Sequence, residues 1–214
     1  MAFILTQHPS IANHFLAELR HKEIQTDRMR FRRNMERLGE VFAYEISKKL
    51  PYANVEIETP LGITETCLLT DQPVLTTLVR AGLPLHQGLL NYFDRADNAF
   101  IAAFRKLKKS GAFELHKEYM SSPSLDDRIV IVSDPMLATG RSMVLTCQEL
   151  LGTFRIKELH IVVAIATEEG LEHVKAYLPK AKLWVGAVDS EMTSKAYIVP
   201  GLGDAGDLAF GPKS

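Results

Sequence analysis

The residues with the clearest chemical potential lie in one short stretch, 134–142, which reads DPMLATGRS. An apolar run at 129–132 precedes it and is typical of a buried strand, which would carry Asp134 to its carboxyl end. A helix that begins near the end of the stretch would point unpaired N–H groups at a phosphate. Thr139 and Ser142 add hydroxyls, and the Asp134 carboxylate can accept from two ribose hydroxyls at once. The stretch predicts a sugar-phosphate site, with an ordinary capped strand-to-helix turn as the plainer interpretation.

Two other kinds of nucleotide site fit this stretch poorly. A Walker A loop needs a glycine five positions before its second glycine, where this chain has Pro135 ahead of Gly140, and Arg141 stands in place of the lysine. A dinucleotide-binding loop needs GxGxxG between the strand and the helix, and 134–142 does not contain that spacing. A kinase or a dinucleotide-dependent enzyme is therefore disfavoured, and is kept as an alternative.

The elements that must position these residues follow from the apolar pattern. After residue 73 the pattern alternates between short apolar runs and amphipathic helices. Strands are predicted at 74–79, 99–104, 129–132, 159–166 and 183–188, and helices at 83–93, 142–151 and 168–177. Such alternation is typical of an α/β fold, in which a mostly parallel twisted sheet is flanked by helices. Ligands of these sheets bind at the carboxyl ends of the strands, which is where Asp134 is expected.

The first 72 residues are expected to form helices and a hairpin. Asp27 can cap a long helix running toward Lys49. Its apolar residues recur every three or four positions, at Met35, Leu38, Phe42 and Ile46. Pro51 ends this helix, and 54–68 has the pattern of a β-hairpin. A length of 214 residues predicts a single domain. Its three parts are the helices and hairpin (1–72), the α/β core (73–190) and a C-terminal segment (191–214).

Two segments do not fit the alternation of strands and helices. The polar stretch 105–127 exceeds the ~15 residues usual for a loop inside a domain, so it predicts either a functional loop, such as a lid, or a disordered segment. The stretch 197–211 has glycines at 201, 203, 206 and 211 and is predicted to contain no regular element. It is also too apolar for a disordered tail. A ligand-wrapping loop is predicted there, with a plain turn at 201–206 as the alternative.

Composition narrows the possible partners. Lys plus Arg number 25 and Asp plus Glu number 26, so the net charge is -1 and no basic excess exists for general nucleic-acid binding. The apolar run at 161–166 is far shorter than the ~18 residues that a membrane-spanning helix needs. Cys67 and Cys147 form no CxxC pattern. A disulfide framework and a cysteine-based zinc site are therefore not expected, and the cytoplasm is the predicted compartment.

Taken together, these motifs resemble the uracil phosphoribosyltransferase family, a branch of the type I phosphoribosyltransferases. The stretch 134–142 resembles the family's loop for phosphoribosyl pyrophosphate (PRPP). The stretch 78–83, LVRAGL, resembles its Leu-Arg-Ala-Gly-Leu segment, and 197–211, YIVPGLGDAGDLAFG, resembles its uracil-binding segment. Two pairs on the first long helix also match, Phe31-Arg32 and Tyr44-Glu45. The resemblance covers nearly the whole chain, and the match at 197–211 is its most specific part, because other phosphoribosyltransferases lack that segment.

The resemblance implies a role for each matched position. Asp134 would hold the ribose hydroxyls of PRPP, 139–142 would cradle its 5-phosphate, and Arg80 with Arg105 would contact its pyrophosphate. The implied PRPP-binding set is Arg80, Arg105, Asp134, Pro135, Met136, Leu137, Ala138, Thr139, Gly140, Arg141 and Ser142. The implied uracil-binding set is Ile198, Gly203, Asp204 and Ala205. Asp204 would also lie near PRPP and its Mg²⁺, and the implied catalytic residues are Asp134, Arg80, Arg105 and Asp204.

The implied activity is the transfer of the phosphoribosyl group of PRPP to uracil, which gives uridine monophosphate (UMP) and pyrophosphate in pyrimidine salvage. Mg²⁺ would be the cofactor, with Asp204 as the candidate protein ligand. The resemblance also implies a homodimer or homotetramer and a GTP effector. The alternative is a non-catalytic pyrimidine regulator that binds PRPP or a nucleotide and also RNA, which a net charge of -1 does not favour.

Two departures from the family pattern concern positively charged residues. Arg141 stands where the family usually has a second glycine. The residues Lys106, Lys108 and Lys109 follow Arg105 where the family typically has acidic residues. These lysines are expected either to form an electrostatic funnel for the anionic PRPP or to be an ordinary solvated face. Arg105, which begins this basic run, could likewise belong to an ordinary solvated face.

Overall fold

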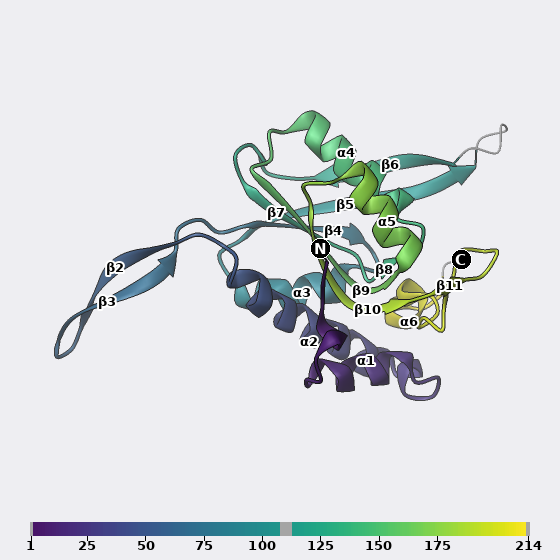
Figure 1. Cartoon of the computed structure of the whole chain (residues 1–214), viewed down its shortest axis with the longest axis horizontal. Helices are drawn as coiled ribbons and strands as arrows, with labels where there is room; N and C mark the ends of the chain where they lie inside the picture. Colours follow the sequence, from purple (N-terminus) through teal and green to yellow (C-terminus); the bar gives the residue numbers. More distant parts are fainter. Residues whose placement is uncertain (1, 108–112, 213–214) are drawn as a thin grey trace.

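An eight-stranded β-sheet forms the centre of the molecule (Figure 1). The computed structural model describes residues 2–107 and 113–212, with the backbone alone for 103–107 and 113–118. The strand order is β1-β10-β9-β7-β4-β5-β6, and β8 also pairs with β9. All of these pairs are parallel except β5 with β6, which is antiparallel at one edge. The strands of this sheet are β1 (Phe3–Ile4), β4 (Val74–Val79), β5 (Asp97–Leu107), β6 (Phe113–Ser121), β7 (Ile129–Ser133), β8 (Met136–Leu137), β9 (Glu158–Thr167) and β10 (Lys182–Asp189).

Helices cover both faces of the sheet, so the predicted α/β fold is confirmed (Figure 1). The first face is covered by α1 (Ala12–Arg20), α2 (Arg28–Ser47) and α3 (Leu83–Tyr92), and the second by α4 (Arg141–Thr153) and α5 (Glu168–Tyr177). Two single turns of 3-10 helix, η1 (Leu5–Gln7) and η2 (Ile24–Thr26), flank α1. Alternate strand residues enter opposite cores: Ile131 and Val162 belong to the first, Val130 and Ile161 to the second. Within the described residues, no helix combines the length and apolarity needed to cross a bilayer.

The predicted N-terminal helix and hairpin are both present. Oδ1 of Asp27 accepts a hydrogen bond from the Arg30 backbone N–H at 3.0 Å and caps α2. The predicted apolar face of α2 is buried, namely Met35, Leu38, Phe42 and Ile46. The hairpin consists of β2 (Tyr52–Thr59) and β3 (Gly62–Leu69), which pair only with each other among the described strands. It extends away from the body of the molecule as an arm (Figure 1).

The prediction of a long loop at 105–127 is wrong for most of that stretch. The strand β5 continues through Leu107, and the chain returns as β6, antiparallel to it. Phe113, Leu115 and Tyr119 alternate with polar residues, which is the period of a strand, but the charged residues between them hid that pattern. The backbone of Lys106 pairs with Glu114 in this hairpin. The other two lysines of the predicted funnel, Lys108 and Lys109, lie outside the described residues.

The prediction that 197–211 lacks regular elements is also wrong. β11 (Glu191–Met192) pairs antiparallel with β12 (Ile198–Val199), and α6 (Ala205–Phe210) follows. Oδ1 of Asp204 accepts from the Asp207 backbone N–H at 2.9 Å and caps α6. This cap stabilises a helix start that the neighbouring glycines would otherwise weaken.

Candidate active site

A cavity of about 210 Å³ lies where the chain leaves the carboxyl ends of β4 and β7 and meets the C-terminal segment. Its position agrees with the expectation that ligands bind at the carboxyl ends of parallel strands. Of the residues nominated from the sequence, those that line it are Asp134, Pro135, Met136, Ala138, Ile198, Gly203, Asp204 and Ala205. The structure therefore brings the predicted PRPP loop and the predicted uracil segment to one cavity.

The other nominated residues lie beside this cavity or away from it. Leu137 is buried in the core under α4 and α5, so its side chain packs inward. Arg80 directly precedes Ala81, a lining residue. Thr139 and Gly140 end the loop, and Arg141 and Ser142 open α4. The structure places the Arg105 backbone in β5, opposite Leu115, and does not describe its side chain.

Four further lining residues were not nominated from the sequence: Ala81, Ala196, Tyr197 and Gly206. Three of them lie inside the stretches 78–83 and 197–211, so the same motifs could have indicated them. Sequence reasoning also missed that Gly201, Gly203 and Gly206 have GxGxxG spacing. The strand before these glycines, β12, pairs with β11 outside the main sheet, so they do not form the strand-to-helix turn of a dinucleotide-binding fold.

Backbone hydrogen bonds hold the loop 134–142 against β9. The Asp134 N–H donates to the Val162 carbonyl oxygen at 3.1 Å. The Pro135 carbonyl oxygen accepts from Ala164 at 3.1 Å and from Ile165 at 3.0 Å. The short strand β8 then pairs with β9 before the chain turns into α4. These contacts are made by backbone atoms, and Asp134 itself lines the cavity.

The end of the loop packs tightly against the start of α5. Thr167 Oγ1 donates to the Ala138 carbonyl oxygen at 2.7 Å and accepts from the Gly170 N–H at 2.9 Å. A Cβ on Gly170 would lie 2.2 Å from that same carbonyl oxygen, and a Cβ on Gly140 would lie 2.7 Å from the Gly170 carbonyl oxygen. Gly140 also has φ of +71°, a conformation that side chains disfavour. A glycine at position 140 is thus required both by this packing and by its backbone conformation.

Arg80 connects the sheet edge to the C-terminal helix. It follows β4, and its peptide bond with Val79 is cis. Its Nη2 donates to Oδ1 of Asp207 on α6 at 2.7 Å, while its Nε is buried and has no partner among the described residues. The guanidinium side chain is 28% exposed, so an incoming anion can reach it. Asp207 was not nominated from the sequence, because its role depends on a contact between distant segments.

The carboxylates at the cavity suit a metal ion that arrives with a substrate. Asp134 and Asp204 both line the cavity, and carboxylate oxygens are ligands that Mg²⁺ prefers. Within the described part of the chain, no group of three or more His, Cys, Asp or Glu side chains is arranged to hold a metal ion. Mg²⁺ often binds through one or two carboxylates together with substrate phosphates. The residues therefore fit Mg²⁺ bound jointly with an anionic substrate better than a resident ion.

Comparison with solved structures agrees with the fold. The chain is similar to the AQ2163 protein from Aquifex aeolicus, with a TM-score of 0.86 and 28% identity over 98% of both chains. It is also similar in fold to a hypoxanthine phosphoribosyltransferase from Staphylococcus aureus, with a TM-score of 0.50 and 13% identity over 74% of each chain. The architecture is thus that of the type I phosphoribosyltransferases.

Comparison with the sequences of known proteins identifies the family to which this chain belongs. The chain is 48% identical to a uracil phosphoribosyltransferase of Porphyromonas gingivalis over 205 residues, which is 95% of both proteins. It is 39% identical over 199 residues to one of Thermococcus gammatolerans, covering 92% of this chain and 87% of the relative. The profile of the family described as "Uracil phosphoribosyltransferase" matches residues 5–212. The chain therefore belongs to the uracil phosphoribosyltransferase family.

Proposed function

We propose that this chain transfers the phosphoribosyl group of PRPP to uracil and releases UMP and pyrophosphate. One observation carries the proposal: residues from the loop 134–138 and residues from the segment 196–206 line the same cavity of about 210 Å³. The first stretch suits a sugar phosphate and the second a flat base, and the fold alone brings them together. No observation favours a regulator that binds RNA without catalysis, and the net charge of -1 speaks against it.

On the PRPP side, Asp134 would accept hydrogen bonds from the two ribose hydroxyls. The 5-phosphate would sit at the start of α4, where the N–H groups and the helix dipole favour an anion. Gly140 is the cap residue of α4 and has no side chain to compete for those N–H groups. The hydroxyls of Thr139 and Ser142 would complete this phosphate site.

On the pyrophosphate side, Arg80 would neutralise the leaving group. Its guanidinium is held on the α6 side of the cavity by the hydrogen bond from Nη2 to Oδ1 of Asp207, at 2.7 Å. An anion at this place would compete with Asp207 for the guanidinium and could use the Nε that lacks a partner among the described residues. Arg105 is the second proposed pyrophosphate ligand, on the grounds of the family resemblance alone.

On the uracil side, the backbone of 198–205 would read the edge of the base. Gly203 has φ of +92°, so a side chain there would be strained, and its absence lets the backbone approach a flat ring. Ile198 is 4% exposed and Ala205 is also 4% exposed, which gives the ring an apolar wall. Backbone N–H and C=O groups would then distinguish uracil from cytosine by their opposite hydrogen-bond pattern.

The proposed mechanism needs no protein nucleophile. The anomeric carbon would gain oxocarbenium character as the bond to pyrophosphate breaks and the uracil nitrogen approaches, and the proton of that nitrogen would pass to the departing pyrophosphate. Asp134 would hold the ribose in position, and Arg80 would balance the charge that develops on the leaving oxygen. Mg²⁺, when bound with PRPP near Asp204, would supply further charge to the pyrophosphate. The β5–β6 hairpin is proposed to limit the access of water, which would hydrolyse PRPP.

We further propose that the chain acts as a homodimer or homotetramer in the cytoplasm. The β2–β3 arm supports the oligomer, because a two-stranded hairpin is marginally stable alone and this one exposes apolar residues. The exposed residues are Tyr52, Val55, Leu61, Ile63 and Leu68. The free thiols of Cys67 and Cys147 suit a reducing compartment. A GTP effector is proposed from the family resemblance, and an unchanged rate when GTP is added at fixed PRPP would contradict it.

The proposed function is tested by incubating the protein with PRPP, Mg²⁺ and one free base at a time. We expect UMP and pyrophosphate from uracil, at a rate at least about a hundredfold above that with cytosine, adenine or guanine, because a hydrogen-bonding site rejects a mismatched edge strongly. Comparable turnover of a purine would place the chain in another branch of the superfamily. Omission of Mg²⁺ should abolish most of the turnover with uracil.

A further inference from the structure

A charged pair lies behind the uracil side of the cavity. Arg20 is the last residue of α1, and Asp189 is the last residue of β10. The guanidinium of Arg20 makes two hydrogen bonds to this carboxylate, Nη1 to Oδ2 at 2.8 Å and Nη2 to Oδ1 at 2.9 Å. The side chain of Asp189 is only 7% exposed, and that of Arg20 is 24% exposed. The pair is therefore largely shielded from water and has the bidentate geometry of a strong contact.

The same pair holds both backbone groups of Gly201. Oδ2 of Asp189 accepts from the Gly201 N–H at 2.9 Å, and Nη1 of Arg20 donates to the Gly201 carbonyl oxygen at 3.2 Å. Three elements that are distant in the sequence thus meet at one residue: the end of α1, the end of β10 and the turn after β12. We refer to Arg20, Asp189 and Gly201 as the clamp.

The clamp fixes the shape of the segment that lines the cavity. Gly201 is buried and has φ of +53°, and a Cβ there would lie 2.2 Å from the Ile198 carbonyl oxygen. The chain therefore folds back tightly on Ile198 before it continues to Gly203 and Asp204. All three of these residues line the cavity, whereas no member of the clamp does.

We propose that Arg20 and Asp189 are positioning residues for the base. They hold the turn at Gly201 so that the backbone of 198–205 presents its hydrogen-bonding groups to uracil at the correct place. This inference rests on the proposed function, because it assigns the specificity of the same site to residues outside the cavity. It goes beyond that function in predicting which substrate the pair affects: uracil, and not PRPP.

A charged pair is suited to this task for a geometric reason. Apolar residues of similar size often give as much stability as a buried ion pair, so stability alone does not explain the pair. An arginine fork, however, can donate to a carboxylate at two points and still reach a backbone carbonyl. Lysine is a point charge and cannot form the same three contacts at once. Arg20→Lys therefore keeps the positive charge but cannot keep both the bidentate contact with Asp189 and the contact with the Gly201 carbonyl oxygen.

The experiment measures steady-state kinetics of Arg20→Lys and Asp189→Asn with each substrate varied in turn. We expect the KM for uracil to rise about ten- to a hundredfold, and the preference for uracil over cytosine to fall, because charge-assisted bonds are lost. The KM for PRPP should stay within about twofold, since the loop 134–142 is held by hydrogen bonds to β9 and to Thr167. The KM for uracil of the double variant should be little higher than that of the more impaired single variant, because both substitutions disrupt the same set of hydrogen bonds.

A matched control is Arg30→Lys. Arg30 also forms a bidentate pair, with Glu18 of α1, at 2.6 and 2.7 Å, and Glu18 accepts in addition from Asn34, so this pair links α1 to α2. Its substitution should lower the thermal midpoint and leave the KM for uracil unchanged. A uracil KM that is unchanged in Arg20→Lys, or KM values that rise equally for both substrates, would overturn the inference.

Two further outcomes are informative. If Arg20→Lys does not fold, Asp189→Asn still decides the matter, because its amide oxygen can keep the bond to the Gly201 N–H while the charge is lost. A wild-type protein without turnover of uracil would overturn the proposed function itself. An active wild type whose clamp variants bind and use uracil normally would overturn only the positioning role.

Discussion

At the scale of single residues, Asp134 has two tasks that a substitution can separate. Its backbone N–H holds the loop to Val162, and its carboxylate is the proposed acceptor for the ribose hydroxyls at the cavity. We expect Asp134→Ala to fold and to lower turnover at least tenfold, because each lost charge-assisted hydrogen bond is worth roughly 1.5 to 3 kcal/mol. Turnover at saturating substrates and the thermal midpoint check both parts. Wild-type activity in this variant would remove Asp134 from the site.

Two residues that sequence reasoning missed, Asp207 and Asp189, have roles that depend on a distant partner. Asp207 acquires its role from Arg80, and Asp189 from Arg20 and the Gly201 backbone. None of these contacts has a local sequence signature, since pairing across so many residues is set by the tertiary fold. By contrast, Asp134 could be nominated because a buried strand and a helix start on either side define its place.

At the scale of elements, the loop 134–142 depends on the close approach of α5. A Cβ on Gly170 would lie 2.2 Å from the Ala138 carbonyl oxygen, so Gly170→Ala must displace either the helix or the loop. We expect it to destabilise the fold by about 1 to 3 kcal/mol, as overpacking does, and to raise the KM for PRPP. Denaturant unfolding and steady-state kinetics measure the two effects.

The control for that change is Gly152→Ala on α4. Nothing lies within 4 Å of a Cβ at this position, and alanine is favoured over glycine in a helix by roughly 0.5 to 1 kcal/mol. Gly152→Ala should therefore stabilise the protein slightly and leave the KM for PRPP unchanged. If Gly170→Ala behaved in the same way, the tight packing of the loop against α5 would not matter for PRPP.

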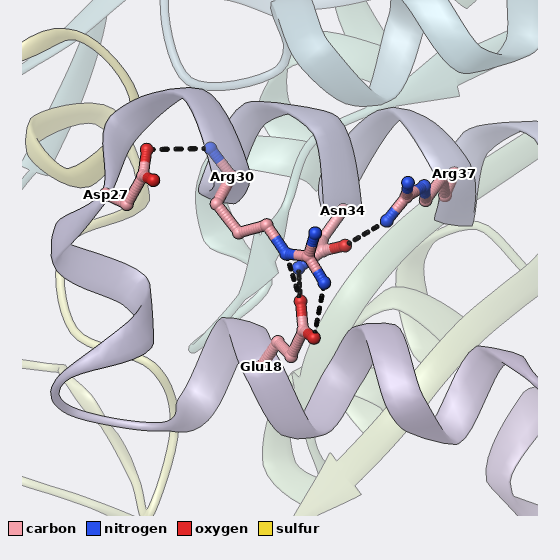
Figure 2. A network of polar contacts seen from close by, with 5 residues as sticks. All are labelled: Glu18, Asp27, Arg30, Asn34 and Arg37. Atoms are coloured by element: carbon pink, nitrogen blue, oxygen red, sulfur yellow. Dashed lines mark hydrogen bonds and ion pairs between the residues drawn. The ribbon is translucent and has the colours of Figure 1, made fainter.

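A polar network joins α1 to α2 (Figure 2). Both helices cover the first face of the sheet, and α1 ends at Arg20 of the clamp. Glu18 accepts from Arg30 at 2.6 and 2.7 Å and from the Asn34 side chain at 2.6 Å. Arg37 donates in turn to the Asn34 side-chain oxygen at 3.0 Å. The hydrogen bonds from Arg30 and Asn34 lower the pKa of Glu18 from 4.5 to about 2.

This lowered pKa predicts an acid-dependent loss of stability. The contribution of Glu18 is fully present above pH 4.5 and is lost as the pH falls toward 2, because the unfolded chain binds the proton first. The thermal midpoint of the wild type should fall more steeply than that of Glu18→Gln between pH 5 and about 2.5. The effect should shrink at high salt, since the Glu18 side chain is 27% exposed.

The matched control is Glu23→Gln, a change at an exposed glutamate just after α1. It should leave the pH profile of the wild type unaltered. Parallel profiles for the wild type and Glu18→Gln would mean that the network in Figure 2 does not contribute to stability at neutral pH.

The observed bounds of three elements show where local sequence signals were sufficient to predict a helix or strand and where they were not. Helix α5 could be predicted at its full length, because Thr167 caps it and its apolar residues recur with helical spacing. Helix α4 ends at Thr153, two residues past the predicted end at 151. It continues through Gly152 because this residue is exposed in the last turn, where the cost of one glycine is small. The strand β1 has two residues and pairs with β10, and so short a segment has no detectable period.

At the scale of the whole molecule, the alternation of strands and helices after residue 73 was enough to predict the sheet and the edge at which the candidate cavity lies. It could not predict strand order, nor that α1 and α2 would lie against the C-terminal segment. Arg32 of α2 donates to the Ala209 carbonyl oxygen at 2.7 Å, and Arg20 of α1 holds Gly201. The N-terminal helices thus support the far end of the chain, a relation that no single stretch of sequence contains.

The arm is the part of the molecule whose stability is least explained within one chain. Its two strands pair only with each other among the described strands, and a lone hairpin is marginal in water. Ile63 is 73% exposed and Leu61, at the turn, is fully exposed. Burial of such side chains against a second copy of this chain would remove an apolar surface that a monomer leaves in water.

The arm therefore predicts that one charge can dissociate the oligomer. The wild type should sediment as a dimer or tetramer, and Ile63→Asp should shift it to the monomer, because an unpaired carboxylate is costly to bury in an apolar interface. Leu145→Asp makes the same kind of change at a leucine that is 42% exposed on α4, and it should leave the assembly intact. Sedimentation velocity over a range of concentrations distinguishes these states. A wild-type monomer, or an Ile63→Asp variant that assembles normally, would mean that the arm is not an interface between copies.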